Sequence, residues 1–74
     1  MGYFMRYEIE YVYRFDSPIG MLRAEYGSER IYKEWNLSLN RARSLAYRMG
    51  YKKYGDNLSQ CNIWPLDKFP YESL

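Results

Sequence analysis

Residues 3–15 read YFMRYEIEYVYRF, and large apolar side chains alternate with charged ones along this stretch. Because successive side chains of a β-strand point to opposite faces, the alternation predicts a strand that buries one face and exposes the other to water. The apolar face consists of the odd-numbered residues Tyr3, Met5, Tyr7, Ile9, Tyr11, Tyr13 and Phe15. The rest of the chain is expected to cover that face.

The chain has 74 residues, which is enough for one domain with a small core. Aromatic residues make up 20% of the chain, and ten of them are Tyr. A tyrosine has an apolar ring and a polar hydroxyl, so a tyrosine-rich face serves either as core or as a wet binding surface. Composition leaves both uses open.

Shorter segments indicate further strands after the first one. Residues 16–20 contain Asp, Ser, Pro and Gly, which favour a chain reversal. Residues 21–26 alternate and predict a shorter strand antiparallel to the first, and Gly27-Ser28 is a second turn candidate. Residues 30–35 alternate as well, which predicts a third strand.

This third strand competes with a helix, because its apolar residues also fit the helical spacing of the residues that follow. One helix over residues 29–49 is the alternative. Asn36 and Ser38 oppose that helix, since such side chains favour caps over helix interiors. We therefore favour a strand, a break at residues 35–37 and then a separate helix.

Residues 39–49 predict an amphipathic helix with one apolar stripe. Ser38 is expected to cap its start, and Gly50 to end it in a left-handed conformation with Tyr51 as the following apolar residue. The stripe consists of Leu39, Ala42, Leu45, Ala46 and Met49. In the predicted core, Tyr7, Ile9 and Tyr11 are buried against Leu39, Ala42, Leu45 and Ala46.

The remaining residues predict a loop over 51–57 and a final strand over 59–64 that ends at Pro65. The expected fold class is α+β: a small antiparallel sheet of three to four strands with one amphipathic helix packed on one face, in the order β-β-(β)-α-β. Residues 1–64 are expected to form a single domain, and residues 65–74 a C-terminal tail.

Several classes of function are disfavoured by the residues that the chain contains. It has no His and a single Cys, Cys61, so we expect no metal, no cofactor and no internal disulfide. Glu8 and Glu10 share a strand face with arginines, which suggests ion pairing at the surface instead of acid–base catalysis. We expect no enzyme activity. No secretory leader or membrane-spanning run is visible, so a cytoplasmic protein without membrane contact is expected.

Charge is concentrated in the middle of the chain, where residues 30–54 hold seven basic side chains and one acidic one. Arginines and tyrosines here suit an acidic protein surface, and they also suit phosphates and unpaired bases. A solvated helix face is the simplest interpretation. The candidate partner-binding residues are Arg41, Arg43, Tyr47, Arg48, Tyr51, Lys52, Lys53 and Tyr54.

The predicted strand pair, the helix SLNRARSLAYRMGY and the short last strand resemble a group of very small phage proteins that bind host machinery, among them the T7 phage inhibitor of bacterial RNA polymerase. The resemblance is architectural, covers residues 7–64 and carries over no functional residue. It implies a protein-binding regulator or inhibitor of a host enzyme such as RNA polymerase. A nucleic-acid-binding module that uses the same Arg, Lys and Tyr side chains is the alternative, and a structural subunit is a third reading. The acidic ends of the chain favour a protein partner.

Overall fold

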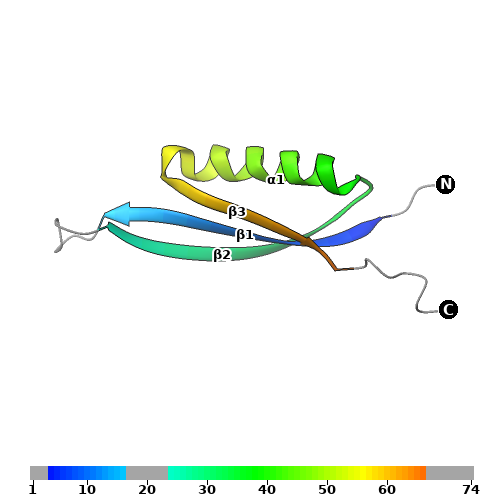
Figure 1. Cartoon of the computed structure of the whole chain (residues 1–74), viewed down its shortest axis with the longest axis horizontal. Coiled ribbons are helices and arrows are strands. Elements are labelled where there is room, and N and C mark those ends of the chain that lie inside the picture. Colours follow the sequence, from blue (N-terminus) through cyan, green and yellow to red (C-terminus); the bar gives the residue numbers. More distant parts are fainter. Residues whose placement is uncertain (1–3, 17–23, 67–74) are drawn as a thin grey trace.

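The computed structural model describes residues 4–16 and 24–66, which form three strands and one long helix (Figure 1). In chain order these are β1 (Met5–Asp16), β2 (Ala24–Trp35), α1 (Leu39–Tyr54), the short 3-10 helix η1 (Gly55–Asn57) and β3 (Leu58–Pro65). Their arrangement is an antiparallel sheet with one helix on one face, which confirms the predicted α+β class.

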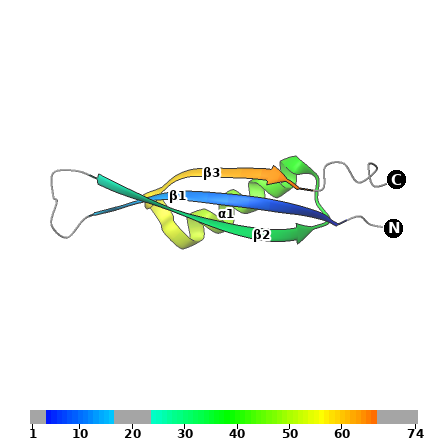
Figure 2. The same ribbon diagram turned by 90° about the horizontal axis from the view of Figure 1, so that it is seen from below.

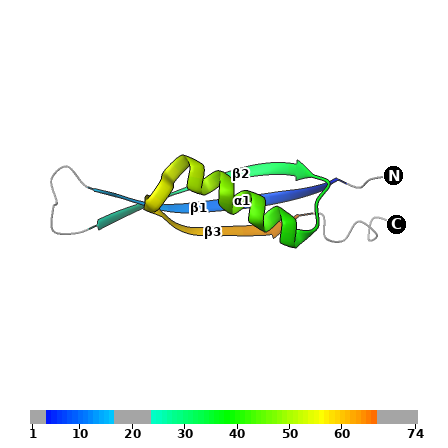
Figure 3. The same ribbon diagram turned by 90° about the horizontal axis from the view of Figure 1, so that it is seen from above.

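The first strand is the centre of the sheet, whose strand order is β2-β1-β3. Both neighbours run antiparallel to β1, so β2 and β3 are parallel to each other and α1 is the crossover between them (Figures 2 and 3). The pairing with β2 continues to Asp16, whereas the pairing with β3 ends at Tyr13 after an irregularity. The β1–β2 hairpin therefore projects beyond β3 and α1 (Figure 1).

The odd-numbered face of β1 is buried where α1 covers it. Tyr7 and Ile9 are fully buried and Tyr11 is 2% exposed, as the alternation predicted, and Ala42 and Ala46 are fully buried above them. Two expected core residues are exposed, Leu39 at 37% and Phe15 at 42%. Four others are only half-buried: Met5, Tyr13, Leu45 and Met49. Leu39 is the first residue of α1 and precedes its buried row, and Phe15 lies on the projecting part of the hairpin.

Two tyrosine hydroxyls of β1 hold the helix in place. The Tyr7 hydroxyl donates to the Leu37 carbonyl oxygen over 2.6 Å, and the Tyr11 hydroxyl donates to the Ala46 carbonyl oxygen, also over 2.6 Å. Four strand residues rise about 13 Å, and the mostly helical nine-residue step from Leu37 to Ala46 spans a similar length. The helix therefore runs along β1 in the same direction, and each buried hydroxyl has a partner.

The predicted end of the helix at Gly50 is wrong, because α1 continues to Tyr54. Gly50 is buried inside the helix, where a Cβ atom would lie 2.4 Å from Cε1 of Tyr11. Its missing side chain makes room for the Tyr11 ring. The helix ends instead at Gly55, whose φ of 61° is positive, a backbone angle that favours glycine. Most of the predicted loop over 51–57 is therefore helical.

The predicted turn at Gly27-Ser28 is also wrong, since β2 is one uninterrupted strand. Gly27 lies opposite Tyr13, and a Cβ atom on Gly27 would meet the Tyr13 ring at 2.7 Å. The ring lies over the glycine in place of a cross-strand side chain. Here too the glycine accommodates a tyrosine instead of a turn.

Residues 30–35 are strand as predicted, but they continue the strand that begins at Ala24 and do not form a separate third strand. The break before α1 agrees with expectation, because β2 ends at Trp35 and α1 begins at Leu39. The Ser38 hydroxyl accepts a hydrogen bond from the Arg41 backbone N–H over 3.4 Å, as expected for the cap. Pro65 ends β3 as predicted. Within the predicted chain reversal at 16–20, Asp16 is still strand and the other residues lie outside the described part. Residues 21–23 of the predicted second strand and residues 67–74 of the expected tail also lie outside the described part.

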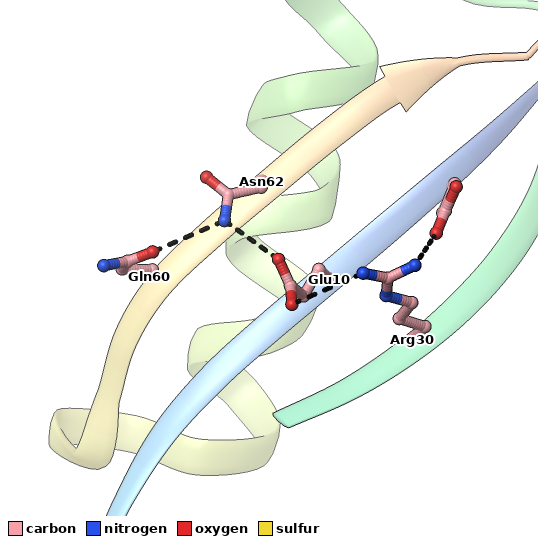
Figure 4. Close-up of polar contacts among 5 residues, drawn as sticks. Glu10, Arg30, Gln60 and Asn62 are labelled. Atoms are coloured by element: carbon pink, nitrogen blue, oxygen red, sulfur yellow. Dashed lines mark hydrogen bonds and ion pairs between the residues drawn. The ribbon is translucent and has the colours of Figure 1, made fainter. Parts of the chain in front are cut away.

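Within residues 4–16 and 24–66 no helix covers the opposite sheet face, which carries a row of polar side chains across the three strands (Figure 4). Arg30 of β2 pairs with Glu8 over 2.8 Å and with Glu10 over 3.9 Å. The Asn62 amide of β3 donates to Glu10 over 3.2 Å and to Gln60 over 3.4 Å. These carboxylates therefore take part in ion pairing, with a cation from the neighbouring strand.

Candidate functional site: the outer face of helix α1

The side of α1 that faces away from the sheet carries most of the predicted binding residues. Because the helix repeats every 3.6 residues, the row Ala42, Ala46 and Gly50 turns inward and the arginines and tyrosines between them turn outward. We define the outer face as the exposed residues Arg41, Arg43, Tyr47, Arg48, Tyr51 and Lys52. All six belong to the predicted site.

Tyr47 and Tyr51 form a nearly parallel ring pair on the outer face. They lie one helical turn apart, their ring centroids are 6.4 Å apart and their planes differ by 21°. The side chains are 55% and 50% exposed. The Tyr51 hydroxyl donates to Oδ1 of Asp56 over 3.2 Å, and the charge of that carboxylate raises the pKa of Tyr51. The pair therefore presents ordered aromatic surface to solvent.

A first depression separates α1 from the edge strand β3. It is shallow and open, with a volume of about 600 Å³. Cys61 of β3 contributes to its lining, and burial raises the pKa of that thiol, so the thiol stays protonated at neutral pH. The lining residues are Arg43, Ser44, Tyr47, Arg48, Tyr51 and Cys61. Two cations and two rings thus surround a neutral thiol.

Cys61 was not among the predicted site residues, although the sequence held a signal for it. The alternation in the last strand places Cys61 on the same face as Ile63, and Cys61 pairs with Tyr11, which points toward α1. A residue on this face of an edge strand is expected to lie beside the helix. The missing information was which flank of α1 lies over β3.

A second depression of about 380 Å³ lies on the other flank of the helix. Leu37 and Leu45 give it an apolar part, and Arg41 adds a cation. The full lining is Leu37, Asn40, Arg41, Ser44, Leu45 and Arg48. Ser44 and Arg48 line both depressions, so Arg48 stands on the ridge between them and its guanidinium can reach a ligand on either side.

Lys53 and Tyr54 were predicted in the same site but engage the sheet. Lys53 Nζ lies 2.9 Å from both carboxylate oxygens of Glu29 on β2, and the Tyr54 hydroxyl donates to the same carboxylate. These bonds lower the pKa of Glu29, and the bond to Glu29 raises the pKa of Lys53. The Tyr54 ring stacks on Tyr13 at a centroid distance of 4.5 Å. Both side chains therefore fasten the end of α1.

Comparisons with models of protein families, with curated protein sequences and with solved structures found no match. Within residues 4–16 and 24–66, no helix is long and apolar enough to cross a membrane.

Proposed function

We propose that this chain is a small protein-binding regulator or inhibitor, and that the outer face of α1 binds an acidic surface of a larger protein. The observation that carries the proposal is the position of Arg48 between two open depressions, next to an exposed tyrosine pair. Arginine and tyrosine are the side chains that most often anchor protein interfaces. Among the described residues, the core cluster under the helix does not include Tyr47, Arg48 or Tyr51.

The charge distribution favours a protein over a nucleic acid as the partner. The sequence pI is about 8.7, below the value above 9 that is typical of nucleic-acid-binding domains. Asp56 bonds to Tyr51 at the end of the outer face, and Glu8 and Glu10 lie on the far side of the sheet. These carboxylates weaken the field that phosphates would experience.

A nucleic-acid-binding module is the second candidate, and the tyrosine pair is the observation in its favour. Half-exposed parallel rings offer faces on which unpaired bases stack, while Arg43 and Arg48 are placed to neutralise phosphates. The two candidates use the same residues, so only the partner distinguishes them.

A pull-down from cell lysate with and without nuclease tests the proposal. Arg48→Glu should abolish capture of the partner. Arg14→Glu is the control and should not, because it makes the same charge change at an exposed position of β1, outside the outer face. Both variants should keep the wild-type melting temperature, since exposed substitutions change stability little. Retention of every captured partner by Arg48→Glu would overturn the site, and loss of capture after nuclease treatment would favour the second candidate.

Salt titration of the purified complex separates the candidates quantitatively. The slope of log affinity against log salt is about 0.9 per contacted phosphate for duplex DNA, whereas an interface held by tyrosine and arginine anchors gives a shallower slope. Bacterial RNA polymerase, which the architectural resemblance implies, is one partner to assay directly.

A further inference from the structure

The two edges of the sheet differ in how open they are. β3 is the shorter edge strand and ends in Pro65, which has no backbone N–H to offer. β2 pairs with β1 along its whole length from Ala24 to Trp35, and within the described residues no strand pairs with its other side. It contains no proline and no irregularity. A long, regular edge of this kind is a template for another strand.

The backbone groups that face outward on β2 follow from one hydrogen bond and the register. The Leu66 N–H donates to the Arg6 carbonyl oxygen over 2.7 Å, so the backbone groups of Arg6 point toward β3. In an antiparallel ladder this direction alternates, so the backbone groups of Ile9 point toward β2 and meet those of Ile31. The outward groups of β2 therefore belong to Ser28, Arg30, Tyr32 and Glu34.

We propose that β2 pairs antiparallel with β2 of a second copy of this chain, with the two-fold axis at Ile31, to give a continuous six-stranded sheet. In this register Ile31 meets Ile31 on the helix side of the sheet. Glu29 of each copy, whose carboxylate also accepts hydrogen bonds from Lys53 and Tyr54 of its own chain, lies opposite Lys33 of the other copy. The outward backbone groups of Arg30 and Tyr32 bond to each other across the axis. The interface is then self-complementary, as a two-fold contact requires.

Neighbouring registers are less favourable. An axis at Glu29 or at Arg30 places two like charges directly opposite each other, which destabilises a sheet pair. An axis at Tyr32 pairs Arg30 with Glu34 of the other copy, but it places the apolar Ile31 opposite the charged Lys33 on the helix side of the sheet. Only the axis at Ile31 combines an apolar centre with opposite charges on both sides.

The same register keeps both helices on one face of the joined sheet, because helix-side residues meet helix-side residues. Side chains opposed in an antiparallel pair share a face. The outer face of α1 points away from the sheet, so the dimer leaves it open and presents it twice. The dimer does not depend on whether the outer face binds a partner.

Sedimentation velocity over a range of concentrations tests the pairing. Wild type should show a concentration-dependent dimer, and Lys33→Glu should weaken it by about tenfold or more, since two attractive charge pairs become repulsive. Lys52→Glu is the matched control, because it makes the same charge change on the exposed outer face and should leave the dimer intact. A wild-type chain that stays monomeric at all concentrations, or a dimer that Lys33→Glu does not weaken, would overturn the proposal.

Disulfide cross-linking tests the register itself, in a Cys61→Ser background. The two Ile31 positions form a pair without mutual hydrogen bonds, whose Cα atoms lie about 4.5 Å apart, within the range of about 4.4–6.8 Å that a disulfide spans. Ile31→Cys should therefore give a covalent dimer with oxidised glutathione, whereas Lys33→Cys, opposite Glu29, should stay monomeric on a reducing-agent-free gel. Equal cross-linking at both positions, or cross-linking of Lys33→Cys alone, would contradict the axis at Ile31.

Discussion

The two faces of β1 are built from alternate residues of one strand, yet one is buried under the helix and the other carries ion pairs at the surface. On the covered face Tyr7, Ile9 and Tyr11 exclude water, and both tyrosine hydroxyls reach backbone oxygens of the segment above. On the open face Glu8 and Glu10 pair with a cation whose side chain is 57% exposed. Buried area and satisfied buried hydroxyls stabilise a fold far more than surface ion pairs do.

The difference indicates which surfaces of the molecule can change their side chains without loss of the fold. Helix α1 contacts the sheet through its buried inner face and through its last two residues, Lys53 and Tyr54. Changes on the outer face of α1, or on the open face of the sheet, are expected to alter partners without unfolding the domain. Changes under the helix are expected to unfold it.

Ile9→Ala should have the largest effect. Ile9 is fully buried at the centre of the core, so its truncation should lower the free energy of unfolding by about 2–5 kcal/mol. Val12→Ala, a truncation of a half-buried residue from the even-numbered set, is the control and should cost less than half as much. Chemical denaturation of both variants makes the comparison, and equal losses would show that the even-numbered face is as important to stability as the covered one.

Gly50→Ala should come second. The added methyl group would collide with the Tyr11 ring, and overpacking of this kind costs about 1–3 kcal/mol. In an exposed helix the same change would stabilise by roughly 1 kcal/mol, so the sign of the effect is diagnostic. Ser44→Ala on the exposed side is the control and should be neutral or slightly stabilising. A higher melting temperature for Gly50→Ala would contradict the close contact.

Alkaline pH should weaken the covered face next. Burial, with smaller contributions from the charges of Cys61, Glu29 and Tyr54, raises the pKa of Tyr11 to about 12. An unfolded tyrosine has a pKa near 10, so above that value the unfolded chain releases a proton that the folded chain retains. The contribution of Tyr11 to the free energy of unfolding should therefore be constant below about pH 10 and fall as the pH rises toward about 12.

Tyr11→Phe should make this decline with pH shallower, although the raised pKa values of Tyr7 and Tyr54 leave part of it in place. Tyr32→Phe changes an exposed ring on β2 and is the control. The measurement is denaturation at a series of pH values. A decline as steep for Tyr11→Phe as for wild type would rule out Tyr11 as its cause.

The open face should give the smallest effect. Arg30→Met removes the cation that pairs with Glu8 and Glu10, and exposed pairs of this kind contribute about 0–1 kcal/mol. The remaining difference from wild type should shrink in high salt, because exposed charges are screened. A loss as large as that of Ile9→Ala, or one that salt does not change, would contradict the contrast between the faces.

The sequence was sufficient for most of the fold because period-2 alternation and helical spacing encode burial directly. It identified β1, the buried trio Tyr7, Ile9 and Tyr11, the break before α1 and the Ser38 cap. It failed at Gly27 and Gly50, since a glycine that ends an element and a glycine that makes room for a ring look alike in one sequence. Only the fold brings Tyr13 and Tyr11 against them.

The candidate site was predictable to a similar extent and for a similar reason. Helical spacing places Arg43, Tyr47 and Arg48 on one exposed side, and the structure keeps them together. Lys53 and Tyr54 do not belong to the outer face, because both bond to Glu29, which lies far away in the sequence on β2. Long-range pairing of this kind is invisible to spacing within one segment.

The packing of α1 on β1 is tested most directly by a nuclear Overhauser cross-peak between the Tyr11 ring protons and the α protons of Gly50. Tyr11 Cε1 approaches the position of a Gly50 Cβ to 2.4 Å, so a strong cross-peak is expected together with helical chemical shifts through Tyr54. Absence of the cross-peak, with helical shifts that stop before Gly50, would contradict both the tyrosine-held helix and the outer face that it defines.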